Sequence, residues 1–438
     1  MKKFNLLVLI VLSSVLINQS SVQPVQSSPS PSAEIKPETS AAVVKNDGLY
    51  LVDLNKAIDS KLCDGQIVGP KFSPNGEHVV FVRGNSIYIT DLKGNLNLVS
   101  SKFENMNGEY YSWIDNSRIV YSSEKGGLYT YDVQKGITNA IKKGAEYYSN
   151  MIYISDNNLL AEKYKEYTKP NDPGRYVKCF GIVFIDLKTG NEEIVIPDIP
   201  ADWDEDGGTG AGMMPIIAGK SYDSSYVYIF KHFHSGSMSA DGVPFGVYDV
   251  KNKKFISFDN VSTTCNNDNI SPSPIINTQL AFTQTSGRMI WNGNSVGILD
   301  VKDHSFKRLS DKNVNAMTPT FSPDGKYIVY SASPAVTDVL DGKDFFQKGR
   351  QKIYAQNIAT KEVTELTTAK DGFDFGPRYI NNGKTLIFLR WDMKESNDEN
   401  FIVSLWKLEN GKETLISKDI MSVAYYGHMS TEDYMEIK

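Results

Sequence analysis

The sequence predicts an all-β fold built from many short strands, and two observations support this prediction. The 438 residues include 24 Tyr, 20 Phe and 5 Trp beside 33 Gly, a composition typical of strands that alternate with tight turns. A unit of strand, turn and strand also recurs along the chain. With 40% hydrophobic and 22% charged positions, the composition is that of a globular protein and excludes disorder throughout.

The clearest repeat is an aromatic strand end followed by a Pro-Asn/Asp-Gly turn and an apolar strand. Two segments carry it in full, FSPNGEHVVF at 72–81 and FSPDGKYIVY at 321–330. Each predicts a tight hairpin, because the turn residues interrupt two strand-forming runs. Weaker copies bring the number of inner hairpin starts to eight, and they begin at Trp113, Tyr153, Ile216, Ile275, Tyr379 and Tyr425.

A second pattern follows each hairpin: alternating apolar residues that end in Asp or Asn and a further apolar residue. It predicts a third strand that enters a turn. Its copies end at Asp53, Asp91, Asp132, Asp186, Asp249, Asp300 and Asn357, and a looser copy ends at Leu408.

The two series of strands are out of phase at the ends of the chain. The chain opens with a third strand at 49–54 and closes with an inner strand at 422–427. A blade made of two N-terminal and two C-terminal strands would pair the exposed edges and close a ring. The sequence therefore predicts a β-propeller of four-stranded blades over residues 46–438, with seven continuous blades and one composite closing blade. Seven blades in total is the alternative, if residues 421–438 do not form two strands.

Residues 1–21 have the features of a secretory signal peptide. Lys2 and Lys3 precede an apolar stretch that is shorter than the ~20 residues of a membrane span. An uncleaved tether stays an alternative, because residues 18–21 lack a clean small-residue cleavage pattern. Residues 22–45, rich in Ser and Pro, predict a flexible linker. We expect an exported protein, extracellular, periplasmic or on the cell surface, with no membrane span beyond the signal segment.

The charge and the cysteines limit the partners. The net charge is −6 and no long basic run follows the first three residues, which argues against a nucleic-acid partner. Cys63, Cys179 and Cys265 match no zinc spacing and allow at most one disulfide. We expect a monomer.

The units at Phe72 and Phe321 resemble the repeat of the TolB-like propeller family, whose repeats are of the WD40-like type. That family includes exported proteins. The same repeat type occurs in the propeller domains of prolyl oligopeptidases and tricorn-like proteases. The resemblance covers nearly the whole folded part of the chain, and it implies a fold more than an activity.

Long predicted connections between second and third strands point to one binding face. They lie at about 162–180, 231–244, 333–351 and 390–401, and the connection at 202–210 opens on the same face. Long loops on one face of a rigid scaffold commonly bind ligands. Their residues of recognition type are Tyr164, Tyr167, Arg175, His232, His234, Phe345, Arg390 and Trp391. The alternative is that several of these side chains only pack the loops onto the scaffold.

Three motifs suggest chemistry. Asp202, Asp204 and Asp206 alternate before a glycine turn and could converge on calcium, although the later ligands of an EF-hand-type loop are missing; a solvated acidic loop is the alternative. His232 and His234 alternate as two zinc ligands would, but no third ligand lies nearby in sequence. Ser295 fits a Gly-x-Ser-x-Gly pattern at the start of a predicted strand, without the helix that a hydrolase nucleophile needs.

These features predict a non-catalytic exported scaffold that binds a protein, a peptide or an envelope polymer on its long-loop face. The alternative is a propeller-fold polysaccharide lyase or hydrolase. That alternative requires histidine and carboxylate side chains that converge at the mouth of the central channel.

Overall fold

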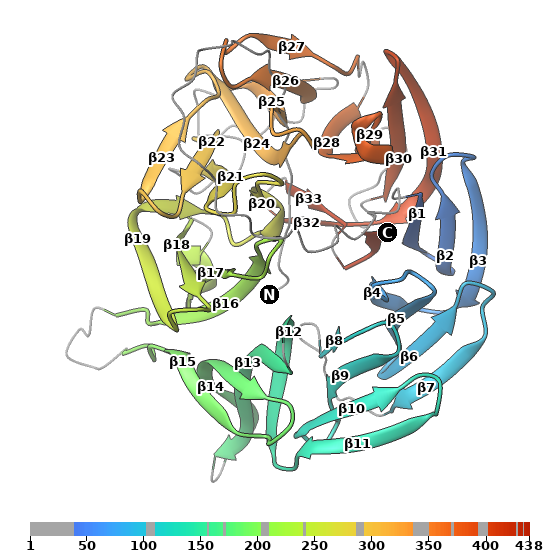
Figure 1. Ribbon diagram of the computed structural model, residues 1–438, viewed down its shortest axis with the longest axis vertical. Helices are drawn as coiled ribbons and strands as arrows, with labels where there is room; N and C mark the ends of the chain where they lie inside the picture. Colours follow the sequence, from blue (N-terminus) through green and yellow to red (C-terminus); the bar gives the residue numbers. More distant parts are fainter. Residues whose placement is uncertain are drawn as a thin grey trace, which may run out of the picture.

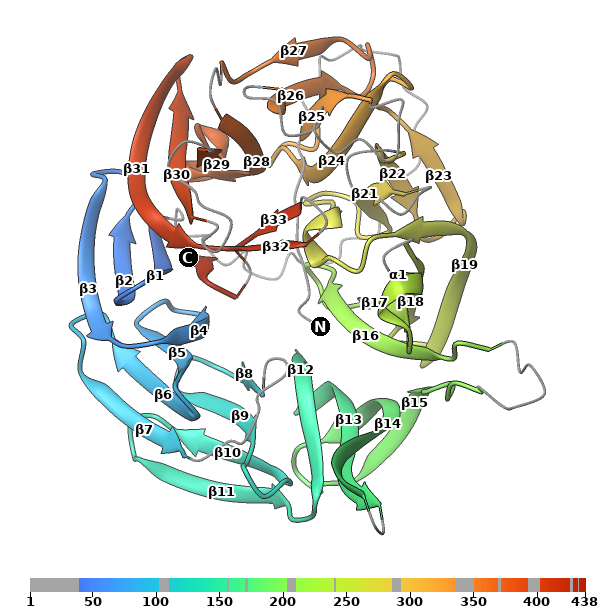
Figure 2. The same cartoon turned by 180° about the vertical axis from the view of Figure 1, so that it is seen from behind.

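The computed structural model describes residues 39–438 apart from 102–109, 156, 170–171, 203–209, 240–241, 286–292, 336–349, 369–371, 393–401, 426–427 and 432. Antiparallel sheets follow one another in chain order around a ring (Figure 1). Figure 2 shows the same ring from behind. The predicted all-β propeller with four-stranded sheets is confirmed. Among the described residues, no helix has the length and hydrophobicity needed to cross a membrane.

Six four-stranded sheets are formed by strands that are consecutive in the described sequence. The first three contain β4 (Ile67–Phe72), β5 (His78–Arg83), β6 (Ser86–Asp91) and β7 (Leu96–Ser100); β8 (Tyr111–Trp113), β9 (Arg118–Ser122), β10 (Leu128–Asp132) and β11 (Ile137–Lys142); and β12 (Glu146–Ser155), β13 (Asn158–Lys169), β14 (Asp172–Asp186) and β15 (Glu192–Pro197). The other three contain β16 (Met213–Lys220), β17 (Tyr226–Phe233), β18 (Val243–Asp249) and β19 (Lys254–Thr263); β20 (Ile270–Pro272), β21 (Gln279–Gln284), β22 (Ser295–Asp300) and β23 (Ser305–Arg308); and β24 (Val314–Phe321), β25 (Tyr327–Pro334), β26 (Lys352–Asn357) and β27 (Val363–Glu365). Short helical turns are α1 (Gly236–Ser239), η1 (Asn267–Asn269) and η2 (Asn381–Gly383).

An eight-stranded sheet contains both ends of the described chain. It joins β28 (Gly372–Ile380), β29 (Thr385–Asp392), β30 (Ile402–Glu409) and β31 (Lys412–Met421) to β1 (Ser40–Lys45), β2 (Gly48–Asp53), β3 (Ile58–Asp64) and β34 (Met435–Ile437). Only the pair Lys45 and Ile420 connects β1 to β31 in the described register. Because this sheet can be divided into two groups of four strands or taken as one unit, the number of blades stays a prediction.

The ring closes with a different set of strands from the predicted one. One C-terminal strand, β34, pairs with β1 of the N-terminal group β1, β2 and β3, so the predicted two-plus-two composition is wrong. The expected inner strand at 422–427 instead contributes β32 (Val423–Tyr425), which pairs with β33 (His428–Ser430) in a separate two-stranded sheet. The C-terminus lies beside β1 in Figure 1.

The predicted linker extends too far along the chain. Its last six residues form β1, in which Ala41, Ala42, Val43 and Val44 have no exposed surface. A continuous apolar run of this kind forms a strand because its side chains are buried against neighbouring strands. A solvated linker has no such strands to pack against. The predicted signal segment and the first part of the linker lie outside the described residues.

The core lies between neighbouring sheets. Phe72 of β4 and Phe81 of β5, for example, pack with Ala42 of β1 and with Tyr434, which precedes β34. Tyr434 is 5% exposed. Residues from the two ends of the chain therefore share one hydrophobic cluster with the first complete sheet.

A serine hydroxyl closes the repeated hairpin. Ser73 Oγ accepts a hydrogen bond of 3.0 Å from the His78 N–H, while the Ser73 N–H donates to the His78 carbonyl at 2.8 Å. Gly76 has φ of 71°, which favours glycine. Ser221 makes the same two bonds with Tyr226, without the Pro and Gly of the full motif. The serine therefore marks hairpins that the full motif does not detect.

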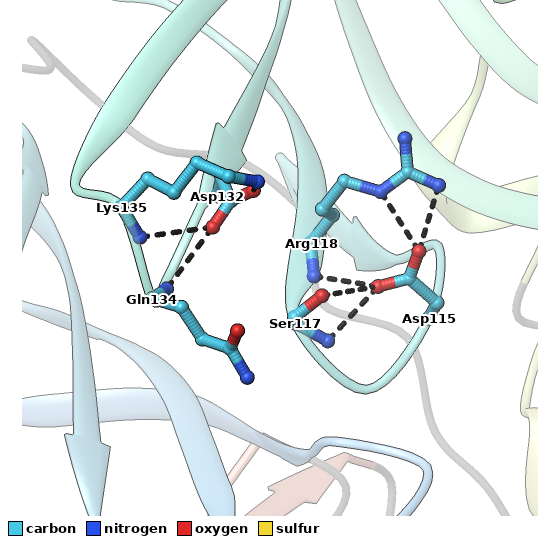
Figure 3. Close-up of polar contacts among 6 residues, drawn as sticks. All are labelled: Asp115, Ser117, Arg118, Asp132, Gln134 and Lys135. Atoms are coloured by element: carbon cyan, nitrogen blue, oxygen red, sulfur yellow. Dashed lines mark hydrogen bonds and ion pairs between the residues drawn. The ribbon is translucent and has the colours of Figure 1, made fainter.

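An aspartate or asparagine at the end of a third strand closes the turn that follows, as Asp132 and Asn357 show. Asp132 Oδ1 accepts hydrogen bonds from the N–H groups of Gln134 and Lys135, at 3.1 and 3.0 Å (Figure 3). Asn357 makes equivalent bonds with the N–H groups of Ala359 and Thr360. The repeated Asp or Asn is therefore a structural turn residue of the Asx type.

Asp115 stabilises the turn of a first hairpin by hydrogen bonds of the same kind. Its carboxylate accepts hydrogen bonds from the N–H groups of Ser117 and Arg118, and it pairs with the Arg118 guanidinium at 2.7 Å (Figure 3). The turn after Trp113 therefore closes without the proline and glycine of the full repeat.

We expect acid to weaken the fold through these turns. Hydrogen bonds from Lys135 hold the pKa of Asp132 below its ordinary value, and hydrogen bonds from Lys188 and Thr189 do the same for Asp186. A carboxylate with a lowered pKa stabilises the fold above its unfolded pKa, and this contribution is lost as the pH falls through the folded pKa. The melting temperature should fall as the pH drops below about 4. The variant Asp132→Asn, which copies Asn357, should lose less stability on acidification than the wild type; an equal loss would contradict this assignment.

Candidate functional site

The structure describes most of the predicted ligand residues. Phe345 lies outside the described residues, and for Arg175 the backbone in β14 is described but the side chain is not. The expected loop at 162–180 is wrong, because β13 and β14 form one long hairpin that stays paired as far as Lys169 and Asp172. Its aromatic and β-branched residues, such as Tyr164, Tyr176 and Val177, favour strands over a loop.

Tyr164 belongs to an aromatic cluster. Its ring stacks on Tyr147 with a centroid distance of 5.4 Å, and its hydroxyl donates a hydrogen bond to the Tyr110 hydroxyl. Burial raises the pKa of Tyr164. The contacts explain this side chain as packing between β13, β12 and the segment before β8.

Tyr167 lies on the hairpin surface. Its side chain is 43% exposed, and its ring lies 5.6 Å from that of Tyr176, the residue directly opposite on β14. Of the predicted ligand residues, it keeps an exposed aromatic face.

Arg390 and Trp391 lie inside β29 and are not recognition residues on a loop. Trp391 is 8% exposed and packs against Phe373 at 5.5 Å between ring centroids. Arg390 makes two hydrogen bonds, of 2.6 and 2.9 Å, to the fully buried carboxylate of Asp374, and a third of 2.8 Å to Glu413. Both side chains therefore hold the sheet together.

Asp374 and Glu413 respond differently to this environment. Burial raises the pKa of Asp374, and the Arg390 guanidinium opposes that rise. Burial would also raise the pKa of Glu413, but the Thr368 N–H and Arg390 outweigh it and lower this pKa. The guanidinium is thus the positive charge that two carboxylates share.

The two predicted histidines have different environments. His232 is the last but one residue of β17, lies opposite Met214 of β16, and is 7% exposed. His234 follows β17, and its Nε2 lies 2.9 Å from Oδ1 of Asp198, which follows β15. The side chains of His234 and Asp198 are 24% and 8% exposed. Only His234 therefore combines a carboxylate partner with access to solvent.

The structure brings this histidine and carboxylate together from two sheets. The Asp198 N–H donates to the Phe180 carbonyl at 3.2 Å, and the His234 N–H donates to the Ala211 carbonyl at 3.2 Å. Burial raises the pKa of Asp198, and His234 opposes that rise. Asp198 belongs to no local sequence motif, because it lies 36 residues before its partner. We refer to the two residues as the His-Asp pair.

A cysteine lies close to the pair but is not an activated nucleophile. The Sγ atom of Cys179 contacts Sδ of Met214 at 3.3 Å. Burial raises the pKa of the Cys179 thiol to about 11, with a further contribution from the negative charge of Asp198. A thiol with a raised pKa is protonated at neutral pH and reacts slowly. The three cysteines are free thiols.

Ser295 is also excluded as a nucleophile. It is the first residue of β22, as the sequence predicts, and it is 8% exposed. It lies opposite Gln284 within a sheet, where no strand-to-helix elbow could present its hydroxyl.

The acidic loop is described only at its base. The Asp202 N–H donates to the Gly210 carbonyl at 2.9 Å, while Asp204 and Asp206 lie outside the described residues. In the described part of the chain, no group of three or more His, Cys, Asp or Glu side chains could hold a metal ion. No cofactor is established for this chain.

Comparisons with known proteins give structural matches of low sequence identity. An oligogalacturonate lyase in complex with manganese matches at 14% identity and a TM-score of 0.40, over 72% of this chain and 84% of the lyase. A puromycin-hydrolysing peptidase from Mycobacterium tuberculosis matches at 9% identity and a TM-score of 0.48, over 90% of this chain and 60% of the peptidase, so this chain spans less than two thirds of it. A protein described as a TolB from Agrobacterium tumefaciens matches at 10% identity and a TM-score of 0.35, over 92% of this chain and 98% of that protein. No family model matches the chain, and no curated protein matches its sequence.

These matches correct the expectation of a non-catalytic scaffold. Most of the similar proteins are enzymes by name: besides the lyase and the peptidase, they include a puromycin hydrolase and a dipeptidyl peptidase. The inference from a propeller fold to a scaffold is therefore wrong, and the alternative of a lyase or hydrolase is retained. Likeness at this level establishes the fold alone, so any activity must be argued from this chain's own residues.

Proposed function

We propose that this chain is an exported, monomeric propeller enzyme of the lyase or hydrolase type, a member of the TolB-like propellers that acts on a peptide or an envelope polymer. The observation that supports the proposal is the His-Asp pair, with 2.9 Å between His234 Nε2 and Asp198 Oδ1. Both residues follow strands of adjacent sheets, at the ends where the sequence predicts the binding face.

The arrangement suits proton transfer. The carboxylate of Asp198 orients the imidazole, because it accepts a hydrogen bond from Nε2. Among the described residues, Nδ1 of His234 has no hydrogen-bond partner. This nitrogen is therefore available to take a proton from water or substrate, or to return one.

The two candidate nucleophiles considered above favour direct proton transfer over covalent catalysis. The Cys179 thiol stays protonated, and Ser295 lies within a sheet. His234 would therefore activate a water molecule in a hydrolase, or remove a substrate proton in a lyase.

A substrate screen with matched variants tests this function. We expect the wild type to turn over a substrate from a panel of chromogenic peptides and polysaccharides, the latter followed by reducing ends and by absorbance of unsaturated products. His234→Ala should lower that turnover by ~10² to 10⁴-fold, the usual contribution of a general acid or base. Asp198→Asn should also lower it.

The control is His304→Asn, which changes an exposed histidine after β22 whose φ of 53° asparagine tolerates. It should keep full activity. No turnover by the wild type across the panel, or equal turnover by His234→Ala, would contradict the proposed enzyme.

Calcium binding at Asp202, Asp204 and Asp206 stays a prediction from the sequence. If calcium binds only the native state, at 100 times its Kd it should stabilise the fold by about 2.7 kcal/mol. Calorimetric titration and melting curves with calcium and magnesium measure this effect, which Asp202→Ala should remove. No heat of binding at millimolar calcium would leave the solvated acidic loop as the explanation.

A further inference from the structure

One face of the β13–β14 hairpin combines exposed lysines with paired tyrosines. Lys165 lies directly opposite Lys178, and Tyr167 lies directly opposite Tyr176. Side chains two residues apart on a strand share a face, so these four residues lie on the same side of the hairpin. We call them the Lys-Tyr face. Figure 1 shows the hairpin at the rim of the ring.

Ion pairing does not explain the two lysines, although the Lys178 ammonium lies over the Phe180 ring, 5.3 Å from its centroid. Like charges directly opposite on neighbouring strands destabilise a sheet. In the described part of the chain, neither ammonium group has a carboxylate partner, and both side chains are exposed. Lys163, by contrast, pairs with Glu192 at 2.5 Å. The Lys-Tyr face thus keeps two uncompensated positive charges on a protein whose net charge is −6.

The tyrosines add two neighbouring aromatic rings beside these charges. The rings of Tyr167 and Tyr176 lie 5.6 Å apart with 31° between their planes, and Tyr167 is 43% exposed. The face of an aromatic ring packs well on the apolar C–H face of a sugar ring. Along a strand, residues two apart are separated by about 7 Å, so charge and ring follow each other on the scale of a sugar unit.

We propose that the Lys-Tyr face binds a carboxylated polysaccharide. The lysine ammonium groups pair with its carboxylates, while the tyrosine rings pack on its sugar rings. A nucleic acid fits less well, because a polyphosphate strand is usually held by many more cations than two. The site is independent of the proposed enzyme function. Cys179 lies close to the His-Asp pair, and because side chains alternate along a strand, Cys179 and the Lys-Tyr face are on opposite faces of β14. Binding to the Lys-Tyr face can also be measured without any turnover.

Affinity electrophoresis of the full chain in gels that contain alginate tests the proposal. We expect alginate to retard the wild type, dextran to have no effect, and 0.5 M salt to remove most of the retardation. Lys165→Gln/Lys178→Gln and Tyr167→Ala/Tyr176→Ala should each weaken binding about tenfold, a modest value for exposed contacts.

The matched control is Lys302→Gln/Lys307→Gln, which removes two exposed lysines around the β22–β23 turn and should bind as the wild type does. Melting curves of all variants check that the fold is retained. Equal retardation of the Lys165→Gln/Lys178→Gln variant and the wild type would overturn the proposal. So would tighter binding of single-stranded poly(dT) than of alginate, which would assign the face to nucleic acid.

Discussion

Removing residues 431–438 is expected to lower the melting temperature by about 10 °C or more. The deletion removes β34 and, with it, the pairs from Ala41–Ile437 to Val43–Met435. It also removes Tyr434 from the cluster that contains Phe81. Loss of one large buried aromatic side chain alone commonly costs about 3–5 kcal/mol, and each kcal/mol shifts the melting temperature by about 2–4 °C in a domain of 150–250 residues.

The effect should reach beyond the last strand. The Tyr434 carbonyl accepts a hydrogen bond of 2.7 Å from the Val44 N–H, and the Asp433 carbonyl accepts one of 2.7 Å from the Gly69 N–H. The deletion therefore leaves open edges on β1 and beside β4, and open edges favour aggregation. Scanning calorimetry and light scattering measure both consequences.

Two point variants distinguish the loss of ring closure by β34 from a general effect of shortening the chain. Tyr434→Ala should reproduce a large part of the loss, whereas Tyr434→Phe keeps the buried ring and should cost much less. A truncated chain that melts within about 2 °C of the full-length chain would show that β34 does not close the ring.

The fold could be predicted because its repeat is local. Ser73 bonds to His78 and Asp132 to Gln134, each within a few residues, so the chemistry of a turn is visible in the sequence. Closure could not be predicted in detail, because β34 is only three residues long and its partner β1 lies almost 400 residues away. The apolar segment at 423–425 is the expected closing strand, yet it pairs with β33 in a separate two-stranded sheet.

The candidate site was predictable only in part. His234 belongs to a noticeable His-Phe-His segment, but Asp198 has no local motif. Asp198 can be identified as the partner of His234 only when β15 and β17 are known to lie in adjacent sheets. Arg390 and Trp391 are of the residue types that bind ligands, yet β29 continues to Asp392 and buries them. Side-chain type does not tell whether a residue at a strand end faces solvent or the next sheet.

The burial of Asp374 gives the second large prediction, for the variant Arg390→Met. It removes the guanidinium that makes two hydrogen bonds to a carboxylate with no exposed surface. Breaking a buried ion pair by removing one partner commonly costs about 3–5 kcal/mol, because the other charge is left uncompensated. Denaturant unfolding at pH 7 should show a loss of this size. The control Arg118→Met removes an exposed guanidinium that pairs with Asp115 and should cost less than about 1 kcal/mol.

The pH dependence of the stability of Arg390→Met shows whether the lost charge causes the destabilisation. Burial raises the pKa of Asp374, and Arg390 is the main group that opposes this rise, with a smaller contribution from a hydrogen bond of Thr367. A group whose folded pKa lies above its unfolded value favours folding below the unfolded pKa, and that contribution is lost as the pH rises through the folded pKa. The stability difference between Arg390→Met and the wild type should therefore be smaller at pH 4 than at pH 8. Adding Asp374→Asn should recover part of the loss at pH 8, because an amide carries no charge. A loss that is independent of pH and unchanged in the double variant would mean that Arg390 acts through its packing on Trp406, at 4.7 Å, and not through its charge.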